Sequence, residues 1–168
     1  MSKPGIAVVD TSVIILIGAP SDDPETVARR ARAHDRLLRF QKEGAVFAVA
    51  APSIAELHRD GPGGETADRI LGQFGDLRID ALDLEAAEYA GQSLRATLSS
   101  RGPGASRNAV KFDALIAGVA HRIGATHLLT ADKRDFERHL GEMQSAIEVV
   151  VVSDPPEKGQ LRLIDQGG

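Results

Sequence analysis

Cysteine is absent from this sequence of 168 residues, and its absence limits the chemistry that the chain can perform. Without cysteine, the protein can have neither a disulfide framework nor a thiolate metal site. Any metal ion must therefore be bound through oxygen or imidazole ligands.

Long hydrophobic runs are missing as well, which bears on where the protein is expected to work. No apolar run reaches the roughly 18 to 20 residues that a membrane-spanning helix needs. The first residues, Met1 to Gly5, lead directly into a strand-like run, with no long apolar segment before a small-residue cleavage site. We therefore expect a cytoplasmic protein that does not enter a membrane.

An excess of positive charge is also lacking, since the formal net charge is -4. This charge argues against a protein coated in basic surface, although local patches can still contact phosphates. Positive charge is concentrated in residues 29–39, RRARAHDRLLR, which we expect to lie on one helix. Two interpretations of this helix stay open: a solvated face, or a surface for nucleic acid or a protein partner.

Apolar runs typical of strands recur along the chain, and helical segments separate them. The expected strands are residues 6–9, 46–50, 77–79, 126–130 and 147–152. The helices are expected at residues 12–17, the arginine-rich segment, from 53 onward, 66–74, 83–98, 112–123 and 132–140. Gly124 is expected to end the helix over 112–123, whose faces are nearly all apolar.

This alternation predicts an α/β fold. Strands that alternate with helices imply right-handed crossovers and a mostly parallel sheet covered on both faces, so we expect a three-layer α/β/α sandwich. The length and the mass of 17.8 kDa fit a single domain. We place this domain at residues 1–153 and expect a C-terminal tail at 154–168.

Acidic residues stand where such a fold collects its functional groups, at the carboxyl ends of strands and at adjoining helix starts. Asp10 follows the first expected strand, Glu56 the second and Asp132 the fourth, while Asp113 lies in a buried helix. Several acids in one cleft repel one another unless a metal neutralises them, and hard divalent cations prefer carboxylate oxygen. The pattern predicts a Mg²⁺ or Mn²⁺ site suited to phosphoryl chemistry.

Two of these acids also have a purely structural interpretation as helix caps. Asp10 could cap the helix that begins near Ser12. Ser53-Ile54-Ala55-Glu56 matches a capping box, in which the glutamate reaches back to the backbone, although Pro52 favours the first helical position and would make Ala51 the cap.

The other two acids have structural alternatives of different weight. Asp113 could interact with a helix dipole from the first turn. Its neighbours 114–120 offer no polar face, however, and a buried unpaired carboxylate costs several kcal/mol. Asp132 and Asp135 lie three residues apart at an expected helix start, so one could cap the helix and the other complete its first turn.

Four segments together resemble the motifs of the PIN-domain family. Val8-Val9-Asp10-Thr11-Ser12 resembles the first motif and Ala55-Glu56-Leu57 the second. Residues 112–117, FDALIA, and 124–136, GATHLLTADKRDF, resemble the third and fourth at their usual separation. The resemblance covers residues 6–152. It implies a metal-dependent nuclease, commonly the endoribonuclease toxin, VapC-type, of a type II toxin–antitoxin pair, often a homodimer inhibited by a small antitoxin.

The resemblance also assigns roles to individual residues. It implies that Asp10, Glu56, Asp113 and Asp132 bind the metal and form the catalytic site, with Thr11, Ser12 or Thr130 orienting ligands or water and Asp135 as a possible substitute. The chain departs from the family pattern through added material around 18–26, 61–64 and 101–107. These loops bear on RNA substrate choice and on antitoxin docking.

Other folds that place an aspartate after the first strand fit these residues less well. A haloacid-dehalogenase-type phosphatase needs a second aspartate two positions after Asp10, where this chain has Ser12. A response-regulator receiver needs an acidic pair beside its phosphoacceptor, which Val8-Val9-Asp10 does not supply. A housekeeping nuclease and a non-catalytic RNA-binding module of the same fold remain open. The five histidines show no paired metal-ligand spacing.

Overall fold

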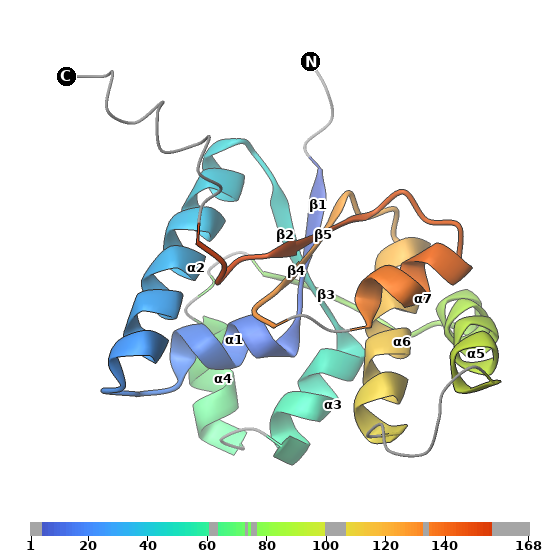
Figure 1. Cartoon of the computed structure of the whole chain (residues 1–168), viewed down its shortest axis with the longest axis horizontal. Coiled ribbons are helices and arrows are strands. Elements are labelled where there is room, and N and C mark those ends of the chain that lie inside the picture. Colours follow the sequence, from blue (N-terminus) through green and yellow to red (C-terminus); the bar gives the residue numbers. More distant parts are fainter. Residues whose placement is uncertain are drawn as a thin grey trace.

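The computed structural model describes residues 5–60, 64–72, 74, 77–99, 107–132 and 135–155. The strands of the described chain are β1 (Ile6–Val9), β2 (Val46–Ala50), β3 (Arg78–Asp80), β4 (His127–Thr130) and β5 (Glu148–Val151). The helices are α1 (Thr11–Gly18), α2 (Pro24–Lys42), α3 (Ala51–Asp60), α4 (Gly64–Gly72), α5 (Leu84–Ser99), α6 (Arg107–Arg122) and α7 (Phe136–Glu142). Helices lie on both sides of one central sheet, which confirms the three-layer α/β/α sandwich (Figure 1).

The sheet is parallel throughout, in the order β3-β2-β1-β4-β5. After β1 the chain adds β2 and β3 on one side, and it then returns to add β4 and β5 on the other. The reversal falls between β1 and β4, where Val9 pairs with Leu129. In open parallel sheets this switch point leaves a crevice at the carboxyl ends of the strands, where ligands bind.

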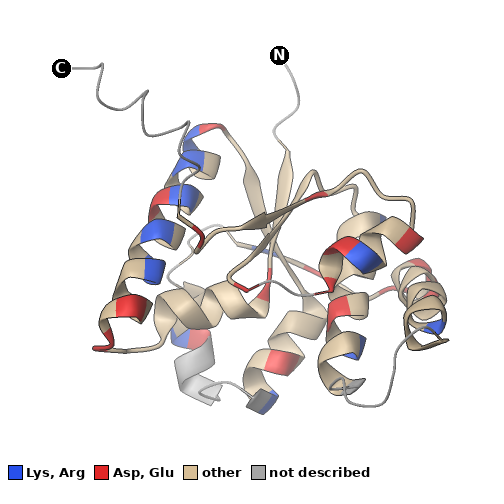
Figure 2. Ribbon diagram, viewed as in Figure 1, with Lys and Arg blue, Asp and Glu red and all other residues tan. Residues whose placement is uncertain are grey.

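The charge on α2 serves largely to fix the helix to the rest of the fold. Figure 2 shows Lys and Arg positions repeating along α2. One of these residues, Arg30, donates from Nε to Leu16 O at 2.9 Å and from Nη2 to Ala19 O. These carbonyls lie at the end of α1, where a helix leaves its last carbonyl groups without intrahelical partners. Arg30 therefore caps α1 from outside.

Further along α2, two arginines hold the end of β5. Arg32 Nε donates to Ser153 O at 2.7 Å, and Arg36 Nη1 donates to Val151 O. Arg39, by contrast, forms an exposed ion pair of 2.7 Å with Asp35 one helical turn away. The solvated-face interpretation of the arginine-rich helix therefore fits Arg39, whereas Arg32 and Arg36 bind the backbone of their own chain.

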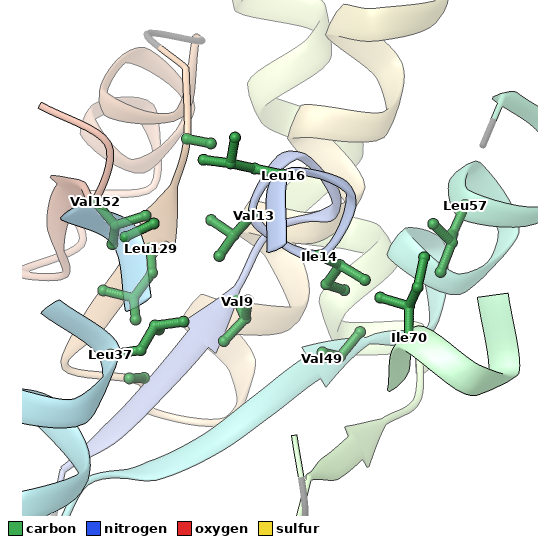
Figure 3. Packing of buried hydrophobic residues seen from close by; sticks show 13 residues of the cluster. Val9, Val13, Ile14, Leu16, Leu37, Val49, Leu57, Ile70, Leu129 and Val152 are labelled. Carbon is green, nitrogen blue, oxygen red and sulfur yellow. The ribbon is translucent and has the colours of Figure 1, made fainter. Parts of the chain in front are cut away.

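Two apolar clusters fill the spaces on the two faces of the sheet. The first includes Val9 of β1, Val13 and Ile14 of α1, and residues of α2, α3 and α4. Figure 3 shows Val13 and Ile14 above Val9. The second joins the opposite sheet face to α5, α6 and α7, and it includes Val8 and Phe136. Because both faces are covered, β1 contains three fully buried residues in a row, Ala7, Val8 and Val9.

Several expected boundaries differ from those observed, and two differences change the interpretation of acids. Helix α3 begins at Ala51, directly after β2, so Ser53 lies inside the helix and the capping-box interpretation of Glu56 is wrong. Helix α7 begins at Phe136 rather than at residue 132, so Asp132 lies in the segment after β4 and not in a helical first turn. Neither Glu56 nor Asp132 therefore has the capping role considered from the sequence.

The end of α6 follows the expectation from the sequence. Gly124 has φ of 67°, its N–H donates to His121 O, and the N–H of Ala125 donates to Ala120 O. The left-handed backbone at Gly124 is the conformation that glycine adopts most readily at a helix end. The predicted start of α6 was wrong, because the helix begins at Arg107, five residues before the expected start.

Three expectations fall partly or wholly outside the described residues. These are the loop around 61–64, the loop around 101–107 and the tail from 154 to 168, of which only residues 154 and 155 are described. The third loop, around 18–26, is described and connects α1 to α2. Within the described ranges, no helix has both the length and the apolar character needed to cross a membrane.

Helix α6 approaches α5 closely at Gly118, which gives a test of the packing. A Cβ added at Gly118 would lie 2.4 Å from Ala86 O, a backbone atom that cannot move aside without shifting α5. We expect Gly118→Ala to lower the free energy of unfolding by about 1–3 kcal/mol, as overpacking does. Urea unfolding followed by circular dichroism measures the difference.

The matched control is Gly91→Ala on α5, because nothing lies within 4 Å of a Cβ added there. This variant should be neutral or more stable by up to about 1 kcal/mol, since alanine favours helix. Equal stability of the two variants would show that the α5–α6 contact is looser than described.

Candidate functional site

Asp10 is the buried centre of the candidate site. It follows β1 and occupies the N-cap position of α1, with none of its surface exposed. Its Oδ2 accepts a hydrogen bond from Ser12 Oγ at 2.6 Å and lies 3.4 Å from Ser12 N. The capping interpretation is confirmed, but the same oxygen also lies 3.1 Å from Thr130 Oγ1 at the end of β4, a contact that capping does not require.

Ser12 and Thr130 connect the ends of β1 and β4 through their hydroxyl groups. Ser12 Oγ accepts from the N–H of Ala131 at 2.9 Å and lies 3.2 Å from Thr130 Oγ1. The hydroxyl of Thr130 has Asp10 Oδ2 at 3.1 Å and the carbonyl oxygen of Asp132 at 2.9 Å as acceptors. Because a hydroxyl carries a single proton, Thr130 donates to one of these oxygens at a time.

Helix α3 brings Glu56 to the same end of the sheet. Thr11 Oγ1 lies 3.4 Å from Ser53 O, a long hydrogen bond that links the first turn of α1 to α3. Glu56 is one turn further along α3, and only 8% of its surface is exposed. The direct passage from β2 into α3, without a loop, places this glutamate beside the carboxyl ends of β1 and β2.

A pocket of about 310 Å³ opens beside these residues. Glu56, Asp132, Thr11 and Ser12 all line it, so four of the residues expected from sequence share one cavity. The other described lining residues come from α1, α2, the loop between them and the segment after β4: Ile15, Leu16, Ala19, Ser21, Thr26, Arg29, Arg30 and Ala131. The pocket thus lies at the switch point of the sheet, where a ligand site is expected.

Asp132 faces α2 across this pocket. Its Oδ1 lies 2.7 Å from Arg29 Nη2, which also donates to Ala131 O at 2.8 Å. The side chain of Asp132 is 58% exposed and that of Arg29 is 32% exposed. Exposed ion pairs of this kind contribute about 0–1 kcal/mol to stability, so Arg29 holds Asp132 only weakly.

The N-terminus of α2 is fixed by a cap that positions this wall of the pocket. Asp23 Oδ2 accepts from the N–H and from Oγ1 of Thr26, each at 2.8 Å. The backbone hydrogen bond and then the hydroxyl bond lower the pKa of Asp23. A lowered carboxyl pKa contributes stability that is present above the unfolded-state pKa of about 3.9 and lost as the pH falls through the folded-state value.

Asp113 and Asp135 take positions different from those four lining residues. Asp113 is 3% exposed, and it is the seventh residue of α6, so the first-turn dipole interpretation is wrong. It is not among the described residues that line the pocket. Asp135 occupies the N-cap position of α7. The metal-binding and substitute roles expected of these two acids stay predictions.

The acids do not form a ready-made metal site in the conformation described. Among the described residues, no group of three or more acidic or histidine side chains is placed to hold a metal ion. Asp10 faces the hydroxyls of Ser12 and Thr130, and Asp132 faces Arg29. The sequence pattern placed Asp10, Glu56 and Asp132 correctly at one sheet edge. It missed Arg29, which the arginine-rich segment contains without any local signal to single it out.

Comparison with known proteins gives similarity in fold. Neither a protein-family model nor a curated protein matches this chain. A chain of the VapBC-1 structure from nontypeable Haemophilus influenzae matches with TM-score 0.60 and 17% identity over 89% of this chain and 99% of that one. A chain of VapBC2 from Rickettsia felis, bound to a promoter DNA fragment, matches with TM-score 0.57 and 19% identity over 86% and 97%.

A third similar structure is that of a toxin alone. Mycobacterium tuberculosis VapC20, described as a sarcin-ricin loop cleaving toxin, matches with TM-score 0.52 and 18% identity. The match covers 78% of this chain and 92% of VapC20. At sequence identities of 17–19%, the three similar structures establish the fold of this chain.

The Ser12 hydroxyl is the junction of the site, which gives a stability test. Ser12→Ala removes the short bond to Asp10 and the acceptor for Ala131 N–H, while Asp10 remains buried. We expect a loss of about 1–3 kcal/mol in the free energy of unfolding. The control is Ser99→Ala, which removes an exposed hydroxyl near the end of α5 that donates to Arg95 O, and it should change stability by less than about 0.5 kcal/mol. Equal urea midpoints for the two variants would mean that the hydrogen bonds of Ser12 contribute no more to stability than that of Ser99.

Proposed function

We propose that this chain, whose fold is that of VapC-type PIN-domain toxins, is a metal-dependent endoribonuclease that hydrolyses RNA phosphodiester bonds as the toxin of a type II toxin–antitoxin pair. The observation that carries the proposal is the shared pocket. Glu56 and Asp132 line one cavity with Thr11 and Ser12 at the switch point of the sheet. Carboxylates and hydroxyls that converge in this way suit the binding of a hard cation and a phosphate.

The donor chemistry of the site fits Mg²⁺ or Mn²⁺. Carboxylate and hydroxyl oxygens are the ligands that these ions prefer, and the proposed ligands are Asp10, Glu56, Asp113 and Asp132. Because Asp132 is paired with Arg29, a divalent ion has to compete with that guanidinium for its carboxylate. When bound, such an ion activates water and neutralises charge on the phosphate.

The residues of the chain have distinct parts in this proposal. Glu56, in the wall of the pocket, provides a largely buried carboxylate that can hold the ion or accept a proton from water. Ser12 and Thr130 keep Asp10 in a fixed orientation through hydrogen bonds to Oδ2. Thr11 fixes α1 to α3 and so sets the position of Glu56 relative to Asp10.

The proposed partners are a small antitoxin, a second copy of the chain in a homodimer, and the RNA substrate. Two of the similar structures are VapBC complexes, and VapC20 is described as cleaving the sarcin-ricin loop. A housekeeping nuclease and a non-catalytic RNA-binding module are the remaining alternatives. Cleavage of RNA separates the last of these from the other two.

Replacing Glu56 tests the catalytic assignment. Glu56→Gln removes one negative charge from the pocket and keeps the shape of the side chain. We expect RNA cleavage in Mg²⁺ or Mn²⁺ to fall about 100-fold or more, with an unchanged circular dichroism spectrum. Gel electrophoresis of a labelled RNA, with and without EDTA, measures the rate.

The matched control is Glu88→Gln, which removes the same charge from the exposed surface of α5 and should cleave like the wild type. Full activity of Glu56→Gln would refute the role of Glu56, whereas binding without cleavage by the wild type would favour the non-catalytic module.

Expression of the wild type alone should arrest growth while expression of Glu56→Gln is tolerated. Harmless wild-type expression, with RNA cleavage intact, would favour a housekeeping nuclease.

Metal binding can be measured without activity. Added Mn²⁺ should raise the melting temperature of the wild type by mass action, with about 2.7 kcal/mol of stabilisation at 100 times Kd. Asp113→Asn should show much less of this gain, and in EDTA it should melt at or above the wild-type temperature because repulsion between acids is relieved. A metal-independent loss of stability in Asp113→Asn, together with no response of the wild type to Mn²⁺, would refute the metal site.

A further inference from the structure

Arg29 differs from the other pocket arginine in how its guanidinium group is used. Arg30 is held side-on by Nε and Nη2 against the last carbonyls of α1, so it serves the helix end. Arg29 uses Nη2 alone, for Ala131 O and Asp132 Oδ1. Its Nε and Nη1 donate to none of the residues that the structure describes. Since a guanidinium carries five N–H donors in a rigid fork, three donors of Arg29 have no partner among the described residues.

The position of Arg29 places these donors beside the acids of the site. Its side chain lines the same pocket as Glu56 and Asp132 and is one-third exposed. Its anchor is the backbone carbonyl of Ala131, the residue whose N–H binds Ser12. The guanidinium is therefore fixed to Ala131, which also links the end of β4 to Ser12 after β1.

The carboxylates of the pocket make a cationic group necessary for binding a phosphate there. Glu56 and Asp132 are both in the lining, and carboxylates repel an approaching phosphate. A guanidinium binds phosphate through charge-assisted hydrogen bonds, and its planar fork can meet two oxygens at once. The exposed pair with Asp132 holds Arg29 in place without enclosing it.

We propose that Arg29 binds a phosphate of the RNA substrate. Nη2 anchors the guanidinium to Ala131 O and Asp132, while Nε and Nη1 donate to non-bridging phosphate oxygens. This assignment rests on the proposed function, because it takes RNA as the ligand of the pocket. It makes Arg29 a substrate-binding residue supplied by the arginine-rich helix.

The test is direct binding of RNA in EDTA, where cleavage does not obscure the equilibrium. The probe is a fluorescein-labelled single-stranded RNA of mixed sequence, followed by fluorescence polarisation over a range of salt concentrations. Arg29→Gln should raise Kd about tenfold and reduce the slope of log K against log salt by about 0.7, the value of one phosphate contact to a single strand. The melting temperature should stay near that of the wild type.

The matched control is Arg39→Gln, which removes the same charge from α2 but at the ion pair with Asp35, outside the pocket. It should bind RNA with nearly the wild-type Kd and salt slope. Arg29→Lys keeps a charge for Asp132 but lacks the fork, so it should melt like the wild type and bind with a Kd between those of the wild type and Arg29→Gln.

The outcomes separate this assignment from the proposed function. If the wild type binds and cleaves RNA, but Arg29→Gln matches Arg39→Gln in Kd and salt slope, the role of Arg29 is refuted and the nuclease proposal stands. If Arg29→Lys binds as tightly as the wild type, the forked contact is refuted. If the wild type neither binds nor cleaves any RNA, the proposed function fails and the role of Arg29 fails with it.

Discussion

The pairing of β1 with β4 is the constraint on which the site depends. Asp10 N–H donates to Leu129 O at 2.9 Å, and this bond joins the ends of two strands that are far apart in the sequence. It sets the acid at the end of β1 beside the hydroxyl at the end of β4. Since the order in which the chain adds strands reverses between β1 and β4, no helix crosses directly from one to the other, and the crevice between their ends stays open.

Two hydroxyl groups beside the β1–β4 pairing stabilise and orient the carboxylate of Asp10. A fully buried carboxylate such as Asp10 is costly unless hydrogen bonds or charges compensate it. Ser12 in the first turn of α1 and Thr130 at the end of β4 supply hydrogen bonds to the same carboxylate oxygen. The acid is thus oriented by its own helix and by the neighbouring strand together, which is how a rigid sheet positions functional groups.

The sequence predicted the layers and the location of the acids well, because both follow from local patterns. Buried parallel strands are continuous apolar runs, and the acids that follow them fall at one sheet edge by topology. The start of α6 was harder to predict, since residues 107–111, RNAVK, mix polar and apolar residues and lack the nearly continuous apolar run that marked the rest of the helix. The start of α7 also differs from the prediction: the helix begins at the fully buried Phe136, four residues after Asp132.

Side-chain partners were beyond the reach of the sequence for a different physical reason. Arginines 29, 30, 32 and 36 are chemically alike and share one helix, yet they bind three different parts of the chain. Their partners are mostly backbone carbonyls, which every residue has and which carry no signature of their own. Only the position of α2 against α1, β4 and β5 determines which carbonyls each guanidinium binds.

This row of arginines makes the wall of the pocket cooperative. The four side chains reach the end of α1, the segment after β4 and the end of β5 from a single helix. A movement of α2 by the length of one hydrogen bond would stretch all of these contacts together, because the helix is one rigid rod. On this side the wall of the pocket is therefore held at three separate segments of the chain, and the attachment of α2 does not depend on any one of them alone.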